Sequence, residues 1–432
     1  MPVSSRSSLP SASATSGQST SHPVPSRAKP AHVFLFLELF AREGGIQSYV
    51  QDIFQSYLIL SESASQTDLA DLCQPSLPAQ VFLLRDHPDS ANPFQGDVLQ
   101  FHYFKTAAIR WDRLKLAIAL LVYLVRHRPR RVFCGHVNLA PLVGLLCKPL
   151  GIPYTVLTYG KEVWHPLPVP LRWSLQQADT IWTISRYSRD QACAANQLDP
   201  HKVRLLPCAV DGERFTPGTK SPDLIQKYGL AGSQVLLTVA RLWSGDIYKG
   251  VDITIRALPT IAAAVPEVKY LVIGRGDDQP RLARLAAELG VADRVVFAGF
   301  VPTAELVEHY RLADAYVMPS QEGFGIVYLE AMACGVPVVS GDADGSAEPL
   351  QDGRLGWRVP HRDPDAVAAA CITILQGRAA QEQGVAYDQR CDGSWLRQQV
   401  LQCFGKPAFT QQLRYLLLGN GSTEYQGWEP VN

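Results

Sequence analysis

The chain has 432 residues, of which 47% are apolar, enough for the cores of two domains of ordinary size. Only 19% are charged, and 40 basic residues balance 40 acidic ones. This balance excludes nucleic acid as a predicted partner, because binding a phosphate backbone requires a positive excess. The nine cysteines form no Cys-x-x-Cys pair, so we predict free thiols in a reducing, cytoplasmic compartment.

The N-terminal segment differs from the rest. Residues 1–30 are rich in Ser and Pro and contain no acid. They cannot bury enough apolar surface to fold, so we predict a disordered tail, with an organelle transit peptide as the alternative. Apolar, strand-like runs then alternate with helical stretches such as 46–60 and 114–125. The runs are 32–37, 81–84, 131–134, 154–158, 180–184 and 203–206. This alternation predicts a parallel sheet covered on both faces, within a first domain at 31–211.

The longest apolar run, 116–125, is too short to cross a membrane. Basic residues flank it on both sides, among them Arg113, Lys115, Arg126 and Arg128. Two interpretations stay open: a core helix with a solvated basic end, or a surface that also touches anionic lipid at the inner face of a membrane.

A Gly- and Pro-rich linker is predicted at 212–231. The alternating pattern restarts beyond it, with strands expected at 235–240, 270–273, 295–297, 315–318 and 336–339. We therefore predict a second domain at 232–385, helices at 386–418 that return toward the first domain, and a polar tail at 419–432. The fold class is α/β: two doubly wound, Rossmann-like sheets facing across a cleft, with ligands beyond the carboxyl ends of the strands.

The most informative segment is SQEGFGIVYLEAMACGVP, residues 320–337. A strand ends before it, Gly323 and Gly325 form a turn, and an apolar helix follows. Glycines at a helix start allow close approach of a ligand, and the free N–H groups there bind anions. Glu322 and Glu330 lie eight residues apart, roughly 12 Å if both are on a helix, and ionised carboxylates hold sugar hydroxyls well.

This segment is similar to the signature of glycosyltransferase family 4, the group 1 glycosyltransferases, which are retaining enzymes of the GT-B fold. The resemblance extends over most of residues 32–400. It implies a nucleotide-sugar donor in the second domain and an acceptor in the first. It also implies that Glu322 orients the sugar and Glu330 the ribose, with the donor lined further by Gly323, Phe324, Gly325 and Ile326.

Two cations are expected beside this turn. Arg241 follows the strand at 235–240, and Lys249 precedes Gly250 at the start of the next helix. Fixed cations at a strand end suit a diphosphate. The family has an Arg and a Lys that neutralise the leaving diphosphate, so the resemblance makes Arg241, Lys249 and Glu322 the catalytic residues. The loop between Arg241 and Lys249 is longer than the pattern expects.

Other donor-side residues follow from glycine turns and from the resemblance. Gly44 and Gly45 follow the first strand and would face the donor phosphates from the other domain, or form a simple tight turn. Gly274 follows the strand at 270–273 and would make a phosphate-side turn or only a bend. Phe300 and Val301 follow Gly299, where the family contacts the nucleotide base.

The acceptor side is predicted around Thr158-Tyr-Gly-Lys-Glu162, which resembles the family's His-Gly-x-Glu. Tyr159 stands in place of the His. It can donate a hydrogen bond but is a poor base near pH 7, which puts a proton-transfer role in doubt. Glu162 either orients a substrate hydroxyl or caps the following helix. His136 either lines the acceptor side or is a satisfied, partly buried histidine.

Asp342-x-Asp344 and Asp363-x-Asp365 match the metal-binding Asp-x-Asp of another glycosyltransferase fold. We interpret both as chance matches, because Arg241, Lys249 and a helix N-terminus can supply the positive charge. We therefore expect no metal and no cofactor.

The predicted function is retaining, metal-independent transfer of a hexose, mannose first, from a GDP- or UDP-sugar to a glycan, lipid-linked or small-molecule acceptor. Glycolipid or polysaccharide synthesis is the expected setting, with peripheral membrane contact. The alternatives are a nucleotide-sugar epimerase or hydrolase of the same fold, a non-catalytic nucleotide-sugar-binding protein, and a structural interaction protein.

Overall fold

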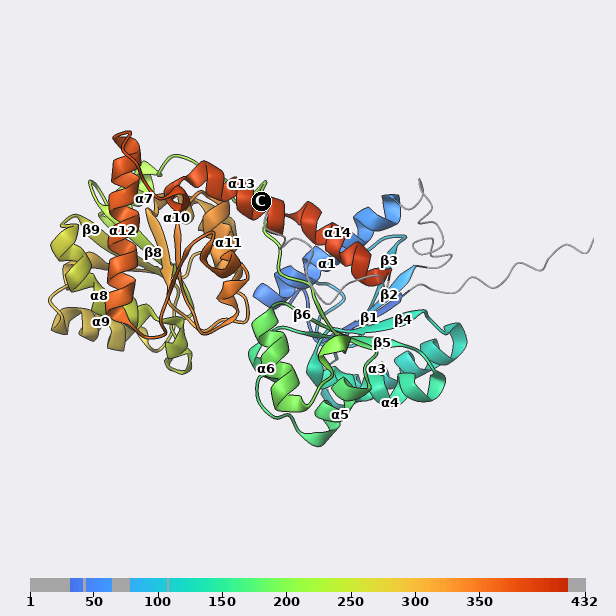
Figure 1. The fold of residues 1–432 in the computed structure, drawn as a ribbon. Coiled ribbons are helices and arrows are strands. Elements are labelled where there is room, and N and C mark those ends of the chain that lie inside the picture. Colours follow the sequence, from blue (N-terminus) through green and yellow to red (C-terminus); the bar gives the residue numbers. More distant parts are fainter. Residues whose placement is uncertain (1–31, 42–43, 64–77, 107–108, 419–432) are drawn as a thin grey trace, which may run out of the picture.

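The structure is a computed structural model that describes residues 32–41, 44–63, 78–106 and 109–418. The predicted tails, 1–30 and 419–432, lie outside the described residues. Two separate parallel sheets organise the described part of the chain (Figure 1).

The first sheet has the strand order β3-β2-β1-β4-β5-β6-β7, and every neighbouring pair is parallel. Its strands are β1 (His32–Phe36), β2 (Ala79–Leu83), β3 (Leu99–Tyr103), β4 (Arg131–Cys134), β5 (Tyr154–Thr158), β6 (Thr180–Thr183) and β7 (Val203–Leu205). All residues of β1, β2 and β5 are buried, as expected of strands that are covered on both faces.

Helices cover both faces of this sheet. In Figure 1, α1 lies above the sheet, and α3, α4 and α5 lie below it. The bounds are α1 (Gly45–Ser63), α3 (Ile109–His127), α4 (Ala140–Leu150), α5 (Val169–Gln177) and α6 (Arg186–Asn196). The helix predicted at 114–125 is thus longer than its apolar run, because α3 also includes charged residues at both ends.

The second sheet has the order β10-β9-β8-β11-β12-β13 and is again parallel throughout. Its strands are β8 (Gln234–Val239), β9 (Val268–Ile273), β10 (Val295–Gly299), β11 (Ala315–Met318), β12 (Val338–Gly341) and β13 (Trp357–Val359). Its helices are α8 (Val251–Ala264), α9 (Gln279–Glu288), α10 (Leu306–Leu312), α11 (Ile326–Ala333) and α12 (Pro364–Glu382). The helix α7 (Pro222–Tyr228) lies in the segment that connects the two sheets.

The last two helices, α13 (Gly393–Phe404) and α14 (Lys406–Leu417), cross from the second sheet to the first (Figure 1). Helix α13 packs on α11, and α14 packs on α1. The backbone N–H of Val210 donates to the carbonyl of Phe404 at 2.8 Å, and Gln412 donates to the carbonyl of Leu205 at 3.1 Å. These bonds tie the chain end to the first domain.

Candidate functional site

The loops predicted for acceptor and donor meet between the two sheets. Gly160 follows β5 with φ +138°, and its Cα faces Gly323, which follows β11. A Cβ added to Gly160 would lie 3.2 Å from the Gly323 Cα, and one added to Gly323 would lie 2.7 Å from the carbonyl oxygen of Tyr159. The two domains therefore touch through backbone, at positions where a side chain would push them apart.

Lys249 and Glu322 form an ion pair at this contact. Lys249 ends the 3₁₀ helix η5 (Ser244–Lys249), and its ammonium donates to Glu322 Oε1. Both side chains are 17% exposed. Burial opposes the charge of Lys249, but the attraction of Glu322 outweighs it, and the net result is a raised pKa. The lysine is therefore held as a cation beside the predicted sugar-orienting carboxylate.

Arg241 lies close to the Lys249–Glu322 ion pair. Its guanidinium contacts Asp246 at 3.0 Å and lies 5.2 Å from the centre of the Trp243 ring. The arginine side chain is 61% exposed. The Asp246 side chain is only 13% exposed, but the guanidinium faces solvent, so an incoming phosphate can reach Arg241. Arg241 and Lys249 also line a single small pocket, together with the start of α8 and with α9.

Asp344 positions the Glu322 segment. Its Oδ2 accepts from the backbone N–H of Glu322 at 2.5 Å, and its Oδ1 accepts from Ser346 N at 2.9 Å. Burial raises the pKa of Asp344 to about 6. Asp344 belongs to the Asp342-x-Asp344 pair, whose metal-like spacing we interpret as a chance match. The aspartate instead organises the turn that carries Glu322, a role that the spacing does not reveal.

The two predicted glutamates do not share a helix. Helix α11 begins at Ile326, so Glu322 lies in the turn before it, and only Glu330 is helical. The 12 Å helical spacing is therefore wrong. Glu330 Oε2 accepts a hydrogen bond from the Tyr310 hydroxyl at 2.7 Å, and burial raises the pKa of Glu330.

The turn residues between the glutamates have different exposures. Gly325 has φ +94° and precedes α11, and an added Cβ would collide with the Tyr328 ring. The Phe324 side chain is buried and packs edge-to-face on Phe404, with ring centres 5.8 Å apart. It can offer a ligand only its backbone. Ile326 is partly buried at the first helical position.

The remaining donor-side predictions lie on loops at the carboxyl ends of the strands. Gly274 has φ +141° and passes so close to the Ala240 carbonyl that no side chain fits. Phe300 is 58% exposed, with the Arg275 guanidinium 4.8 Å from its ring centre, whereas Val301 is buried. This places an exposed aromatic ring where the nucleotide base was expected.

Gly44 and Gly45 are exposed and lie at the start of α1. The preceding loop is fixed by Asp86, a fully buried carboxylate that sequence reasoning missed. It accepts from the backbone N–H groups of Leu39, Phe40 and Ala41 at 2.6–2.8 Å.

The acceptor-side residues are mostly engaged in structure. The Tyr159 hydroxyl donates to the Gly135 carbonyl at 2.8 Å, so in this arrangement it is not directed at a sugar. The Glu162 carboxylate accepts from the Tyr159 N–H, on the N-terminal side of η3 (Lys161–Val163), so it braces the loop and does not cap the helix that follows. His136 accepts at Nδ1 from Asn138 N–H at 3.1 Å and caps η2 (Val137–Leu139); burial and Arg85 lower its pKa.

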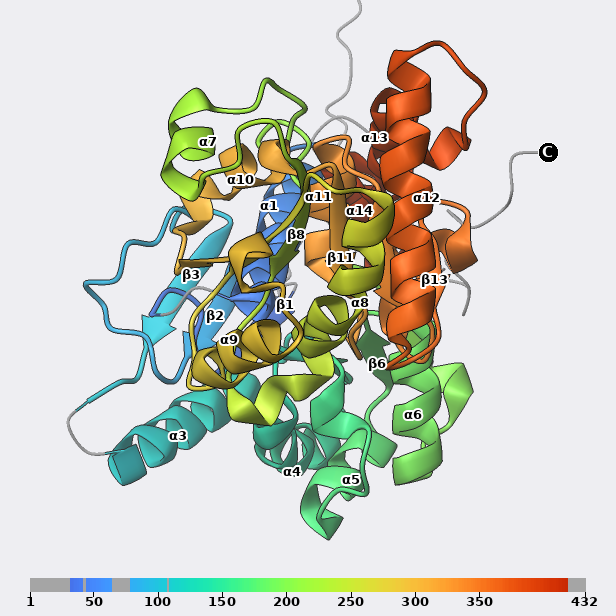
Figure 2. The ribbon, with the colours of Figure 1, turned by 90° about the vertical axis from the view of Figure 1, so that its left-hand side faces the viewer.

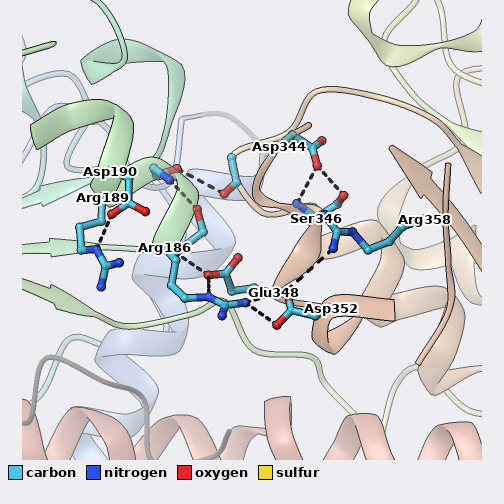
Figure 3. A network of polar contacts seen from close by, with 11 residues as sticks. Arg186, Arg189, Asp190, Asp344, Ser346, Glu348, Asp352 and Arg358 are labelled. Atoms are coloured by element: carbon cyan, nitrogen blue, oxygen red, sulfur yellow. Dashed lines mark hydrogen bonds and ion pairs between the residues drawn. The ribbon is translucent and has the colours of Figure 1, made fainter. Parts of the chain in front are cut away.

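A second group of residues joins the domains (Figure 3). Arg186, the first residue of α6, donates from Nε to Glu348 Oε1 at 2.9 Å and from Nη2 to both oxygens of Asp352 at 3.0 Å. Its backbone N–H also donates to Glu348 Oε1, at 2.5 Å. Burial raises the pKa of Glu348, although Arg186 opposes this shift. Glu348 and Asp352 follow β12, in and around η8 (Gly345–Ala347) and η9 (Gln351–Gly353).

Within the described part of the chain, no group of three or more His, Cys, Asp or Glu side chains could hold a metal ion. Asp363, from the second Asp-x-Asp match, caps α12 through the N–H groups of Asp365 and Ala366, both at 3.0 Å.

Comparison with known proteins identifies the family. The family model described as "Glycosyl transferases group 1" matches residues 233–377. A "GDP-mannose-dependent alpha-(1-6)-phosphatidylinositol monomannoside mannosyltransferase" of Mycolicibacterium smegmatis is 37% identical over 279 residues, which are 60% of this chain and 71% of that protein. A "GDP-mannose-dependent monoacylated alpha-(1-6)-phosphatidylinositol monomannoside mannosyltransferase" of Corynebacterium glutamicum is 32% identical, with 82% of this chain and 91% of that protein covered.

The chain belongs to the group 1 glycosyltransferases. The predicted family and the enzyme class, a hexosyltransferase, are thereby confirmed.

Solved structures confirm the GT-B fold of this glycosyltransferase. Anabaena HepE in complex with UDP and glucose superposes with a TM-score of 0.65 at 18% identity and covers 90% of this chain and 100% of its own. The apo form of the lipopolysaccharide outer core galactosyltransferase WaaB has a TM-score of 0.67 at 16% identity and covers 90% of this chain and 99% of its own. At these identities the likeness is one of fold.

Proposed function

We propose that this glycosyltransferase transfers mannose from GDP-mannose to a lipid-linked acceptor of the phosphatidylinositol type. The observation that carries the proposal is the cation pair Arg241 and Lys249 beside Glu322, directly opposite the Gly160 loop of the other domain. The relatives named above supply the donor and the acceptor class.

The chemistry follows from the ion pairs. A donor diphosphate offers Lys249 and Arg241 a more highly charged partner than their present carboxylates. Exchange would release Glu322 to accept hydrogen bonds from sugar hydroxyls. The two cations would then stabilise the leaving diphosphate as its charge develops, which is the largest catalytic term available here. We further propose that transfer retains anomeric configuration and needs no metal, since these two cations can supply the positive charge that a metal would otherwise supply.

An exposed apolar surface supports a lipid acceptor. Helix α3 buries Asp112, Leu116, Leu120 and Leu124 and exposes an apolar stripe on its other side: Trp111, Leu114, Ile118, Leu121, Val122 and Val125. The neighbouring helices add exposed Leu145, Val169 and Trp173. Figure 2 shows α3, α4 and α5 along one edge of the molecule. No helix among the described residues is both long and apolar enough to cross a bilayer.

Exposed Arg113, Lys115 and Arg126 accompany this stripe. Apolar side chains beside basic ones favour an anionic bilayer surface. We propose that this face rests on the membrane and brings the acceptor loop to lipid headgroups.

One assay tests the proposal. Purified protein is given GDP-mannose, UDP-glucose or ADP-glucose, with EDTA, in the presence of phosphatidylinositol vesicles. We expect mannosyl lipid from GDP-mannose alone, with an α-anomeric linkage by NMR and loss of product in Glu322→Gln. Product from UDP-glucose would contradict the proposed donor, and activity that disappears with EDTA would contradict the proposed metal independence.

Sedimentation with vesicles, compared between wild type and Trp111→Ser/Ile118→Ser, tests whether the exposed face of α3 binds the membrane.

A further inference from the structure

Lys161 is a cation that the acceptor-side domain extends toward the second domain. It begins η3 (Lys161–Val163), directly after Gly160. Its backbone is held firmly, because Gly160 abuts Gly323 and because the Tyr159 N–H donates to Glu162 within the same turn. The side chain is exposed and long enough to leave its own domain.

The ammonium of Lys161 meets the donor-side domain at one aromatic ring. Its Nζ lies 2.8 Å from the centre of the Tyr248 ring, in the loop between Arg241 and Lys249. The Lys249 Nζ lies 5.5 Å from the same centre. Tyr248 thus lies near a lysine of each domain.

Lys161 differs from the two donor-side cations in its partner. Arg241 pairs with Asp246, and Lys249 pairs with Glu322. In the described part of the chain, Lys161 has no carboxylate within ion-pair distance, and the ring of Tyr248 is its partner. Burial lowers the pKa of Lys161, and the nearby charge of Glu322 opposes that shift. An aromatic face holds a cation less strongly than a carboxylate or phosphate does, so Lys161 can be transferred readily to an incoming anion.

We propose that Lys161 binds a phosphate ester of the acceptor beside the transfer site, and so selects acceptors that carry one. The donor diphosphate already has Arg241 and Lys249 on its own domain, whereas Lys161 belongs to the acceptor-side loop. The inference rests on the proposed function and adds the recognition element for its acceptor. The phosphate can belong to a lipid headgroup or to a soluble inositol phosphate, which present the same group to an ammonium.

The test compares Lys161→Ala and Lys161→Arg with wild type on three acceptors: phosphatidylinositol in vesicles, soluble inositol phosphate and inositol. Acceptor-free hydrolysis of GDP-mannose is measured in parallel. Lys148→Ala is the matched control, because Lys148 also lies over a tyrosine ring, that of Tyr154 at 5.9 Å, but belongs to α4.

We expect Lys161→Ala to raise KM at least tenfold for acceptors that carry phosphate, with arginine restoring most of the loss. Transfer to inositol and donor hydrolysis should change less than twofold, as should every activity of the Lys148 variant. An effect on both phosphate acceptors assigns recognition to the phosphate itself, and an effect on the lipid alone assigns it to the bilayer-presented headgroup. Both support the proposal.

A loss shared by all three acceptors, or a loss of donor hydrolysis, would overturn it, because Lys161 would then serve the donor or the fold. If the wild-type protein transfers mannose to none of the three acceptors, the proposed function fails. The proposal for Lys161 is then tested by calorimetry alone. Calorimetric binding of inositol phosphate must then weaken in Lys161→Ala but not in Lys148→Ala; equal binding overturns the proposal.

Discussion

Arg186 holds the two domains together in a way that a single substitution can test (Figure 3). The side chain of Glu348 is 2% exposed, that of Arg186 is 39% exposed, and that of Asp352 is 51% exposed. A hydrogen bond from a cation to a buried carboxylate contributes about 1.5–3 kcal/mol, which the exposure of Arg186 reduces to about 1.5. The half-exposed pair with Asp352 adds about 0.5 kcal/mol.

Arg186→Ala should therefore destabilise the closed arrangement by about 2 kcal/mol, since the backbone N–H of residue 186 still donates to Glu348. This is roughly 30-fold in the closure equilibrium, at about 1.4 kcal/mol per tenfold. Transfer requires both domains at once, so kcat/KM for transfer should fall, by at most that factor. The donor affinity should fall much less than this, because Arg241, Lys249 and Glu322 all lie on the second domain.

The assay pairs steady-state transfer kinetics with small-angle X-ray scattering. The radius of gyration of Arg186→Ala should increase as the domains separate. Arg189→Ala is the control, because Arg189 pairs with Asp190 at 2.8 Å within the same helix and does not cross to the other domain. Wild-type kcat/KM together with an unchanged radius in Arg186→Ala would refute the reasoning.

Three further substitutions address the site and the fold. Gly323→Ala should lower kcat/KM at least tenfold without altering the melting temperature, because its Cβ would lie 2.7 Å from the Tyr159 carbonyl oxygen. Gly96→Ala is the control. Its Cβ would meet nothing within 4 Å, so kcat/KM should not change. Lys249→Met should reduce kcat by about 100-fold with little change in acceptor KM, since one of the two cations that stabilise the leaving diphosphate is lost. Rapid-quench kinetics should show a slower chemical step. An unchanged rate of that step would contradict the assignment. Burial raises the pKa of Asp52 from 3.8 to about 7, so the folded state holds this proton more tightly than the unfolded chain, and stability falls as pH rises from about 4 to about 7. Asp52→Asn should therefore stabilise the protein at pH 8 and much less at pH 4 in urea titrations; an equal effect at both pH values would count against this carboxylate.

The strands that sequence reasoning missed are the edge strands β3 and β13. The residues of β3, LQFHY, alternate between buried and exposed or half-exposed, and β13 has only three residues. Periodicity detects a strand of an α/β sheet when both faces are covered, because the apolar run is then continuous. Both β3 and β13 lie at a sheet edge, where fewer elements cover a strand, and their apolar runs are interrupted or very short. The other two edge strands, β7 and β10, were predicted.

Candidate site residues could be predicted where the residue type and its neighbours in the sequence indicate the chemistry. Glycine turns and charged residues at strand ends drew attention to Arg241, Lys249 and Glu322, which the fold does bring together. The direction of a side chain was not predictable. The Tyr159 hydroxyl points to Gly135, a neighbour that only the pairing of β4 with β5 supplies.

Residues whose partners lie far along the chain could not be predicted from the sequence, for the same reason. Arg186 meets Glu348 and Asp352, 162 and 166 positions away. Nothing in the motif around Lys161 indicates a special role, because its contact with Tyr248 depends on the position of the second domain.

The short segment 344–348 connects sugar orientation to domain closure. At one end, Asp344 accepts from the N–H of Glu322, and the N–H of Gly345 donates back to the Glu322 carbonyl at 2.8 Å. At the other end, Glu348 accepts from Arg186 of the opposite domain. A shift of this segment therefore moves the sugar-orienting carboxylate and the interdomain ion pair together. On this geometry, we expect closure over an acceptor and alignment of the donor sugar to be coupled.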